Sequence, residues 1–413
     1  MKKNELKKIY LVVTPFFPEL NSWRGAYVLD QVKAIQRNSD YDVVVFKCCG
    51  LREKKEPYII NGITVRFTPA WFTPSYIFSG LGNGLNGRLF LQTLKHEGIK
   101  VKNIAVIHSH TAAYACFSAA VKKSNPNVKS LVQYHDRDPY QILYGKFAGV
   151  KLNALFRAWN YMRVFKYLDG HVCISELVRD NLLNFPYAAE HENFQPYLNR
   201  LKQVRCLHRP KGIKTIVLYN GVDTRIFNQN VPRKLSSINR NTFVIGCIGN
   251  FLPLKGHMTL IKAVERIIAN NSMPDLKVIF IGSGMLLEEC KKYIHAHDLD
   301  QFFEFRIEVK HEFLPDFYRS IDLFVLPTMY EGFGCVFTEA AACGTPFMIC
   351  EHQGASEYIA QEDSNKWLIR PNDDQQLADM IERQYHERAS QNLCKPYDID
   401  TLISDYLQQI KKL

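Results

Sequence analysis

The sequence lacks the features of disulfide-stapled, membrane-spanning and repetitive proteins. Its 11 cysteines are odd in number, scattered along 413 residues and without a CxxC pair, which indicates free thiols in a reducing compartment. No stretch approaches the roughly 18 uninterrupted apolar residues of a membrane-spanning helix. The short apolar run from Ile9 to Val13 is soon followed by Pro15, so we expect a β-strand there rather than a signal peptide. These absences predict a cytoplasmic protein, or one that is peripheral at the inner membrane face.

Length and composition predict a globular chain of two domains. Apolar residues make up 46% and charged residues 23% of the sequence, and a chain of this length is too long for one ordinary core. The formal net charge of +11 is unevenly spread: residues 1–214 carry 32 Lys and Arg against 15 Asp and Glu, whereas residues 215–413 carry 20 against 26. A basic first half suits nucleic acid, an anionic membrane or phosphate-bearing substrates, and charge alone does not choose among them.

The hydrophobic pattern predicts an α/β fold with two parallel sheets. Short β-branched runs alternate with longer amphipathic segments, such as 25–37, 260–269, 285–294 and 338–342, which is typical of parallel strands covered by helices on both faces. The pattern restarts after about residue 235, and 229–240 has the composition of a linker. The expected strands are 8–14, 41–47, 63–68, 104–109, 128–134, 170–174, 216–219, 243–248, 277–281, 302–307, 323–326 and 346–349.

Candidate binding residues follow the expected strands, because ligands of open parallel sheets bind at the carboxyl ends of the strands. Gly25 precedes a helix after the first strand, where a phosphate could approach backbone N–H groups. Lys255 follows strand 243–248 at another strand-to-helix turn, although the segment lacks the glycine spacing of a Walker A loop. Each of these signals is weak when taken alone.

The strongest signal follows strand 323–326, where Glu331 and Glu339 flank a Gly-x-Gly turn. The turn bares backbone N–H groups at the start of a helix and can bind an anion. Each glutamate can accept hydrogen bonds from a pair of hydroxyls. A sugar nucleotide, which has diols at both ends and a diphosphate between them, needs this set of groups.

Seven segments in order resemble glycosyltransferase family 4, whose members have the GT-B fold of two Rossmann-like domains facing across a cleft. The Glu331…Glu339 segment resembles that family's Glu–seven residues–Glu motif. The other six cover nearly the whole chain, and they are Ile107–His110, Gln133–Asp136, Cys173–Glu176, Asn220–Phe227, Phe280–Gly284 and Gly354–Glu357. The resemblance implies an N-terminal acceptor-binding domain over 1–228 with a C-terminal helix from about 397 to 413, and a donor-binding domain over 229–396.

The resemblance also implies roles for individual residues. His135, Lys255 and Glu331 would be catalytic: Lys255 would neutralise the leaving diphosphate, Glu331 would hold the hydroxyls of the donor sugar, and His135 would lie beside donor and acceptor. Glu339 would hold the ribose diol, and His110 and Asp136 would lie on the acceptor side. The implied donor-binding set is Gly25, Asn250, Lys255, Glu331, Gly332, Phe333, Gly334, Cys335, Val336 and Glu339.

We expect no metal and no cofactor other than the nucleotide-diphosphate sugar, which is a substrate. Asp136 and Asp138 imitate a metal-binding Asp-x-Asp, but the same spacing recurs at 298–300 and 398–400, so chance produces it easily. His108 and His110 have no third and fourth ligand at suitable spacing for zinc. One departure from the family is Asn250, where many relatives have arginine. Either Lys255 would then stabilise more of the developing negative charge, or another basic residue would substitute for the arginine.

The leading hypothesis is therefore a retaining, hexosyltransferase-like enzyme that transfers a sugar to a glycan or lipid-diphosphate-linked acceptor in cell-surface polysaccharide synthesis. A nucleotide-sugar epimerase or a phosphorylase of the same fold remains open. So does a non-catalytic basic protein that binds membrane or nucleic acid, although the leading hypothesis expects no nucleic-acid partner. Residues 146–168 contain no acidic residue and mix basic with aromatic ones, which predicts either a core-facing helix with a basic outer face or a helix that touches anionic lipid.

Overall fold

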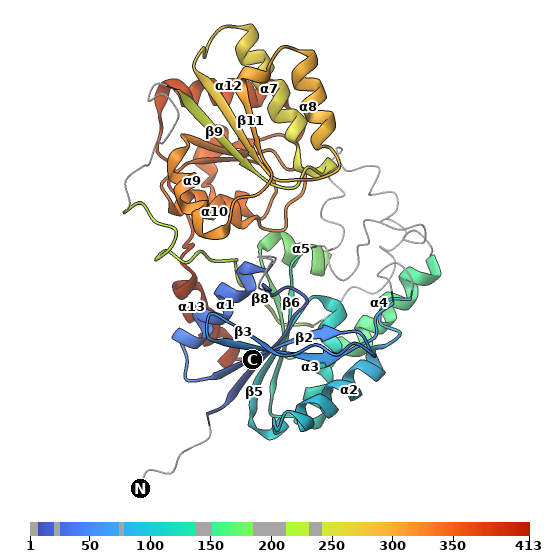
Figure 1. The fold of residues 1–413 in the computed structure, drawn as a ribbon. Coiled ribbons are helices and arrows are strands. Elements are labelled where there is room, and N and C mark those ends of the chain that lie inside the picture. Colours follow the sequence, from blue (N-terminus) through green and yellow to red (C-terminus); the bar gives the residue numbers. More distant parts are fainter. Residues whose placement is uncertain (1–6, 20–24, 74–77, 137–150, 185–211, 231–241) are drawn as a thin grey trace. The chain divides into compact units, whose positions relative to one another are not determined.

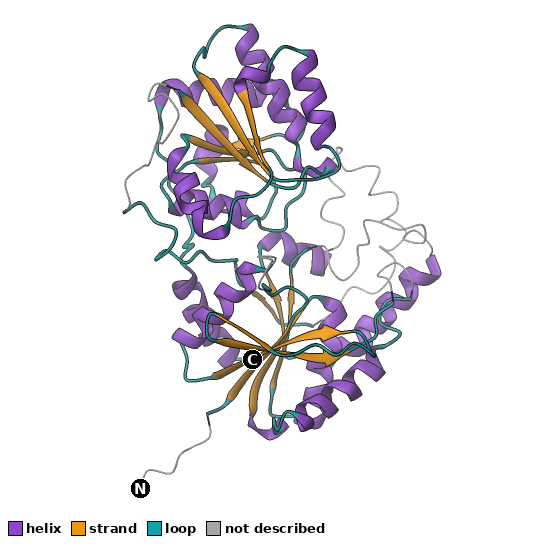
Figure 2. Ribbon diagram, viewed as in Figure 1, coloured by secondary structure: helices purple, strands orange, loops and turns teal. Residues whose placement is uncertain are grey.

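The computed structural model describes residues 7–19, 25–73, 78–136, 151–184, 212–230 and 242–413. The chain forms two compact units (Figure 1). Unit 1 comprises Met1–Asn220 and Ile399–Leu413, and unit 2 comprises Gly221–Asp398. Each unit has its own sheet with helices on both faces (Figure 2). Among the described residues, no helix has the length and hydropathy needed to cross a lipid bilayer.

The sheet of unit 1 has eight strands in the order β3-β4-β2-β1-β5-β6-β7-β8. All neighbours pair in parallel except β3 and β4. The strands are β1 Ile9–Val13, β2 Asp42–Cys49, β3 Tyr58–Ile60, β4 Ile63–Pro69, β5 Ile104–His110, β6 Lys129–Tyr134, β7 Gly170–Cys173 and β8 Thr215–Val217. The helices are α1 Ala26–Arg37, α2 Asn83–His96, α3 Ala115–Ser124, α4 Lys151–Phe165, α5 Glu176–Asn184 and α13 Ile399–Lys411.

The side chains of strand β1 contribute to two hydrophobic cores, one on each face of the sheet of unit 1. Successive side chains of a strand point to opposite faces of the sheet. Tyr10 and Val12 pack in one core with residues of α1 and α13, and Leu11 and Val13 pack in the other with residues of α2 and α3. The run is apolar at every position because both faces of this central strand are covered.

The sheet of unit 2 has six strands, all parallel, in the order β11-β10-β9-β12-β13-β14. The strands are β9 Phe243–Ile248, β10 Leu276–Ile281, β11 Phe303–Arg306, β12 Leu323–Leu326, β13 Phe347–Cys350 and β14 Leu368–Ile369. The helices are α7 His257–Ala269, α8 Leu287–Ala296, α9 Leu314–Ser320, α10 Cys335–Ala342, α11 Ser364–Trp367 and α12 Asp374–Glu387. The two-sheet α/β architecture predicted from the sequence is thus confirmed.

Every strand range expected from the sequence is a strand, with ends that differ by at most two residues. The antiparallel edge strand β3 was not predicted. It is joined to β4 by Asn61 and Gly62, whose φ values are +49° and +79°. Two positive φ angles suit the primed turn of a tight hairpin, so the Asn-Gly pair was a usable signal.

The basic segment 146–168 is helical from Lys151 to Phe165, and residues 146–150 lie outside the described part. Tyr161, Val164 and Phe165 are buried, whereas Leu152 and Trp159 are exposed. Arg157, which a basic outer face would leave in solvent, is 4% exposed. The helix therefore packs one face on the core, as the first hypothesis predicts. It also exposes apolar side chains, which a helix that contacts lipid requires.

Candidate functional site

The strand order of each unit reverses beside its first strand. In unit 2 the order changes direction between β9 and β12, and in unit 1 between β1 and β5. Loops that leave such a pair of strands run to opposite sides and open a crevice at the carboxyl ends, where ligands bind. Lys255 and Glu331 follow β9 and β12, His110 is the last residue of β5, and Gly25 lies between β1 and α1. The sequence candidates thus lie at the switch points.

In unit 2, Lys255 and Glu331 form an ion pair. The Lys255 Nζ donates a hydrogen bond to Glu331 Oε2. The two side chains are 24% and 19% exposed, so both are accessible to a ligand while being partly shielded from water. A cation and a carboxylate side by side can bind a phosphate and a hydroxyl of the same ligand.

The loops that carry this pair are tied to each other by the backbone. The Leu254 carbonyl accepts hydrogen bonds from Met329 N at 2.8 Å and from Thr328 Oγ1 at 3.0 Å. Gly256 has φ +71°, and a Cβ there would lie 2.0 Å from the Pro327 carbonyl oxygen. Only glycine permits this approach, so the residue after Lys255 determines how close the two loops come.

Glu331 is held by a third loop that sequence reasoning had not assigned to the site. Its backbone N–H donates to Gln353 Oε1 at 2.6 Å, and its carbonyl accepts from Gly354 N at 3.0 Å. Gln353 is buried, and its Nε2 donates to the carbonyls of Met329 and Glu351. The family-like Gly354–Glu357 segment thus begins with a clamp on Glu331, while Glu357 itself lies near Lys395 at 3.6 Å.

Glu339 lies on α10 and accepts a hydrogen bond from Tyr318 Oη at 2.8 Å. Tyr318 is fully buried, and burial together with the Glu339 carboxylate raises the pKa of its hydroxyl well above its ordinary value. The hydroxyl therefore stays protonated and remains a donor. The burial of Tyr318 is that of a core residue, and its bond to Glu339 was not predicted from the sequence.

The remaining candidates of unit 2 lie in the turn between the two carboxylates, at the start of α10 and at the end of β9. Gly334 precedes α10 with φ +82°, and a Cβ there would lie 2.8 Å from Glu331 Cγ. The first turn of α10, which begins at Cys335 and Val336, directs its N–H groups out of the helix end. Phe333 is buried, Gly332 precedes it, and Asn250 is exposed at the end of β9.

In unit 1 the site candidates meet around His135. His110 Nδ1 and His135 Nε2 are 2.9 Å apart and share a hydrogen bond. Phe16 and Tyr27 place their rings 5.8 and 5.3 Å from the His135 ring, so segments after β1, β5 and β6 converge on this imidazole. Burial lowers the pKa of His135 to about 3, so the ring is neutral at physiological pH.

A buried polar string continues from this cluster to the C-terminal helix. Tyr10 Oη lies 2.8 Å from both His108 Nδ1 and Tyr406 Oη. Burial lowers the pKa of His108 to about 3, and the rings of His108 and His110 are 4.8 Å apart. Helix α13, which is last in the sequence, therefore supports the strand end that carries His110.

The other candidates of unit 1 lie at the margin of this cluster. Gly25 has φ +89° and precedes α1. Asp136 is exposed and directly follows His135. Its Asp-x-Asp partner, Asp138, lies outside the described residues. Gly25, His110 and His135 are thus gathered at one end of the sheet, as the strand-end rule predicts.

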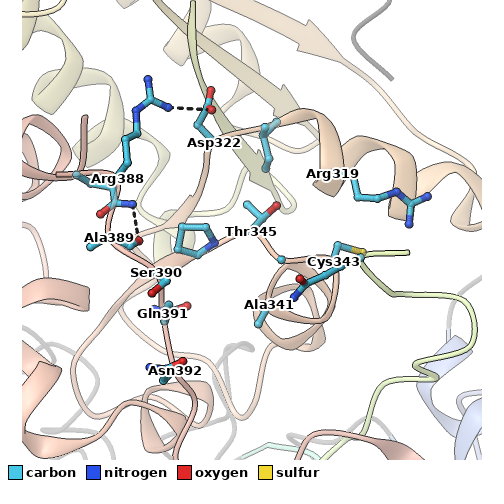
Figure 3. Close-up of a pocket in the computed structure, with 15 residues that line it drawn as sticks. Arg319, Asp322, Ala341, Cys343, Thr345, Arg388, Ala389, Ser390, Gln391 and Asn392 are labelled. Atoms are coloured by element: carbon cyan, nitrogen blue, oxygen red, sulfur yellow. Dashed lines mark hydrogen bonds and ion pairs between the residues drawn. The ribbon is translucent and has the colours of Figure 1, made fainter. Parts of the chain in front are cut away.

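Unit 2 also has a hollow of about 650 Å³ at the other end of its sheet (Figure 3). It is lined by Asp322 and Thr345, which precede β12 and β13, and by Arg388, which follows α12 and pairs with Asp322 at 2.9 Å. Ligands of parallel sheets bind at the carboxyl ends of strands, and these residues lie at the amino ends. The hollow is therefore separate from the Lys255–Glu331 site.

Comparisons with known proteins identify the class. The family described as Glycosyl transferases group 1 matches residues 229–399, and Glycosyltransferase Family 4 matches residues 25–191. Together these matches cover most of the chain, with all six strands of unit 2 and every strand of unit 1 except β1 and β8. The chain belongs to the family 4 glycosyltransferases of the GT-B fold.

Curated relatives match over part of their length. The chain is 27% identical over 166 residues, 39% of this chain and 42% of the relative, to an Escherichia coli protein named UDP-Gal:alpha-D-GlcNAc-diphosphoundecaprenol alpha-1,3-galactosyltransferase. It is 30% identical over 155 residues, 34% of this chain and 40% of the relative, to a Corynebacterium glutamicum GDP-mannose-dependent phosphatidylinositol monomannoside mannosyltransferase. The chain thus spans about two fifths of the length of these relatives.

Solved structures share the fold over the whole chain. HepE from Anabaena, in complex with UDP and glucose, has a TM-score of 0.63 at 18% identity, with 98% of this chain and 100% of that chain covered. Sucrose-phosphate synthase from Thermosynechococcus elongatus has a TM-score of 0.64 at 17% identity, with 98% and 95% covered. At these identities the likeness shows the fold alone.

Proposed function

We propose that this protein is a retaining, metal-independent glycosyltransferase. It transfers a sugar from a nucleotide-diphosphate sugar to a glycan or a lipid-diphosphate-linked acceptor in cell-surface polysaccharide synthesis. The observation that carries the proposal is the Lys255–Glu331 ion pair at the switch point of unit 2, with Glu339 on the adjoining helix. Names of relatives that include UDP-Gal, GDP-mannose and diphosphoundecaprenol support a nucleotide-sugar donor and a lipid-diphosphate acceptor.

In this proposal the bound donor separates Lys255 from Glu331 and becomes the partner of both side chains. The diphosphate takes the Lys255 ammonium, and the hydroxyls of the donor sugar take the Glu331 carboxylate. Glu339 accepts hydrogen bonds from the ribose diol while Tyr318 orients it from behind. The N–H groups at the start of α10 add a fixed positive dipole near the diphosphate.

The reaction breaks the bond between the anomeric carbon and the diphosphate oxygen. The acceptor hydroxyl oxygen forms the new bond from the same face, and its proton passes to the departing diphosphate, so the anomeric configuration is retained. Lys255 and the helix end stabilise the negative charge that develops on the diphosphate. Each such donor is worth about 3–4 kcal/mol of barrier in comparable anion holes. His135 would contact the sugar and acceptor as a neutral group, while the buried His110 would orient its ring.

The proposal is tested by thermal-shift measurements of the purified protein with UDP-, GDP- and ADP-sugars in the presence of EDTA. We expect one nucleotide series to raise the melting temperature, and Glu339→Ala and Lys255→Ala to abolish the shift. Lys262→Ala is the control, because Lys262 is exposed on α7 close to Lys255 in sequence. If no series shifts the melting temperature with or without acceptor, the donor site is wrong.

Turnover assays separate this reaction from related ones. Release of nucleoside diphosphate that depends on an added acceptor supports sugar transfer. Conversion of the donor without an acceptor would instead indicate an epimerase, and strict dependence on inorganic phosphate a phosphorylase. Activity that EDTA abolishes and Mg²⁺ restores would contradict the metal-independent mechanism.

A further inference from the structure

A hollow of about 650 Å³ lies in unit 1 between α2, α3 and α4. Its lining residues come from these helices and their flanking turns, and include none of the strand-end residues described above. Small residues line one side. A Cβ on Gly87 would lie 2.9 Å from Ala120 Cβ, so α2 and α3 are close there, whereas a Cβ on Gly84 would meet nothing within 4 Å. The groove therefore opens to solvent at Gly84.

Four cations line the hollow: Arg88 from α2, Lys123 from α3, and Arg163 and Lys166 from α4 and the turn after it. All four are exposed. The described residues that line the hollow include no aspartate or glutamate. Four positive charges without a carboxylate among them attract an anion.

Apolar and aromatic groups accompany these charges. The Arg163 guanidinium lies 4.6 Å from the centre of the Trp159 ring, and Lys123 Nζ lies 4.3 Å from that of Tyr167. Trp159 is 50% exposed, and Leu152 on α4 and Leu85 on α2, which are outside the lining, are 63% and 44% exposed. Cations beside an exposed indole and exposed leucines match the chemistry of the bilayer interface.

The hollow also contains a buried hydrogen-bond acceptor that has no donor among the described residues. This acceptor is the Oδ1 of Asn83, which lines the hollow. A buried acceptor without a donor is costly unless a donor from outside the chain satisfies it. A ligand here would thus combine a negative charge, a hydroxyl or amine donor and apolar surroundings.

We propose that this hollow binds the headgroup of an anionic glycerophospholipid and docks unit 1 on a membrane surface. The lipid phosphate binds the cations, a headgroup hydroxyl donates to Asn83 Oδ1, and Trp159 and Leu152 enter the interface. Since none of the strand-end residues takes part, the docking does not depend on the proposed transferase activity and can be measured without donor or acceptor.

The experiment measures binding of the full-length protein to vesicles of phosphatidylcholine with 30% phosphatidylglycerol, as an illustrative composition of about one anionic lipid in three. We expect binding to these vesicles, weak binding to pure phosphatidylcholine, and a blue shift of tryptophan fluorescence that Trp159→Phe removes. The triple variant Arg88→Gln, Lys123→Gln, Arg163→Gln should bind about 100-fold more weakly, because each cation near an anionic surface contributes about fivefold. Trp159→Ser should weaken binding with the charge unchanged.

The matched control is Lys95→Gln, Lys100→Gln, Lys102→Gln, which removes the same charge from exposed positions of unit 1 outside the hollow. This control should bind vesicles within about threefold of the wild type, since surface charges beyond a Debye length of about 8–10 Å are screened.

An equal loss in both triple variants would overturn the proposal, because it would mean attraction by overall charge alone. Absence of binding to anionic vesicles, or tighter binding to RNA than to vesicles at the same salt, would also overturn it. Glu331→Gln should bind vesicles normally, which separates this result from failure of the proposed function.

Discussion

Lys255 and Glu331 neutralise each other across 76 positions of sequence, through a hydrogen bond from Nζ to Oε2. The sequence motifs assign both residues to one ligand but give no reason for them to touch. The ion pair keeps a partly shielded cation and a partly shielded carboxylate from being unpaired, which would be costly. In the proposed function, a donor therefore has to offer Lys255 a phosphate and Glu331 hydroxyls at the same time, because a ligand with only one of these groups would leave the other charge unpaired.

Removal of Lys255 should affect both binding and rate. We expect Lys255→Ala to lower kcat about 100- to 1000-fold, because one positive group that faces the developing negative charge is lost. Affinity for the nucleoside diphosphate should fall as well, and calorimetric titration with the diphosphate measures this independently of turnover. Lys262→Ala, on the helix that follows Lys255, is the control. A Lys255→Ala variant with wild-type kcat would contradict the assigned role.

The Tyr318 hydroxyl should contribute to nucleotide affinity through Glu339. Tyr318→Phe removes the 2.8 Å hydrogen bond that orients the carboxylate. We expect the Kd for the nucleoside diphosphate to rise about tenfold, since a hydrogen bond to a charged group contributes about 1.5 kcal/mol. Tyr293→Phe is the matched control, because Tyr293 Oη donates to Glu265 at 2.7 Å on the α7–α8 side of the same unit. Equal effects of the two variants would indicate a loss of stability rather than of orientation.

Gln353 should influence turnover through the backbone of Glu331. In Gln353→Leu, the Glu331 N–H loses its acceptor at 2.6 Å, and the loop that presents the carboxylate should loosen. We expect kcat to fall about tenfold, consistent with about 1–2 kcal/mol for an unsatisfied buried group, while Kd for the nucleoside diphosphate stays within about twofold. Steady-state kinetics measure the change in kcat, and titration with the nucleoside diphosphate measures Kd.

Gln391 offers a matched control for Gln353. Its amide bonds both the N–H and the carbonyl of Phe347, at 3.0 and 2.8 Å, on the side of unit 2 that Figure 3 shows. Gln391→Leu should lower stability by a similar amount without changing kcat. A loss of kcat in Gln391→Leu that equals the loss in Gln353→Leu would count against a specific role for Gln353.

Buried histidines should make the protein less stable as the pH falls below neutrality. Burial lowers the pKa of His171 from 6.5 to about 3, and its Nδ1 lies 2.8 Å from Tyr134 Oη. Above pH 6.5 the ring is neutral in the folded and unfolded states. Below it only the unfolded state gains the proton, so the free energy of unfolding falls by up to about 1.4 kcal/mol per pH unit for this group. The loss continues until the folded ring titrates near pH 3.

Urea unfolding at pH 7.5 and pH 5.5 measures this effect. We expect His171→Gln to reduce the drop in unfolding free energy between the two pH values by about 1.4 kcal/mol, since one titrating group is removed. His96→Gln should leave the drop unchanged, because the His96 side chain is 89% exposed. A drop of the same size in His171→Gln and the wild type would show that the ring is protonated in the folded state.

Much of the fold could be predicted from the sequence because local patterns determine it. The parallel sheets are buried on both faces, so strands such as Phe243–Ile248 are continuous apolar runs that helical spacing does not imitate. The two strands that were missed, Tyr58–Ile60 and Leu368–Ile369, are short and lie at the edges of their sheets. Runs of three and two residues are too short to be recognised by their pattern, and only the Asn61-Gly62 turn marked the first of them.

The candidate site was predicted less completely, for a physical reason. Lys255 and Glu331 each precede a glycine shortly after a strand, and this local pattern can be recognised in the sequence. Tyr318 and Gln353 act through single hydrogen bonds to residues 21 and 22 positions away, and nothing in the local pattern of a buried tyrosine or a loop glutamine indicates its partner.

The sequence by itself determined the class of the protein, the number of sheets and the loops that carry its chemistry, because composition, periodicity and motif spacing are local properties. Only the tertiary structure decided the strand order, which places β9 beside β12 and β1 beside β5. That order depends on how helices cover the two faces of each sheet, which is a matter of packing over the whole unit. It brings Lys255 to Glu331 and His110 to His135, and it gathers the cations of α2, α3 and α4 around one hollow.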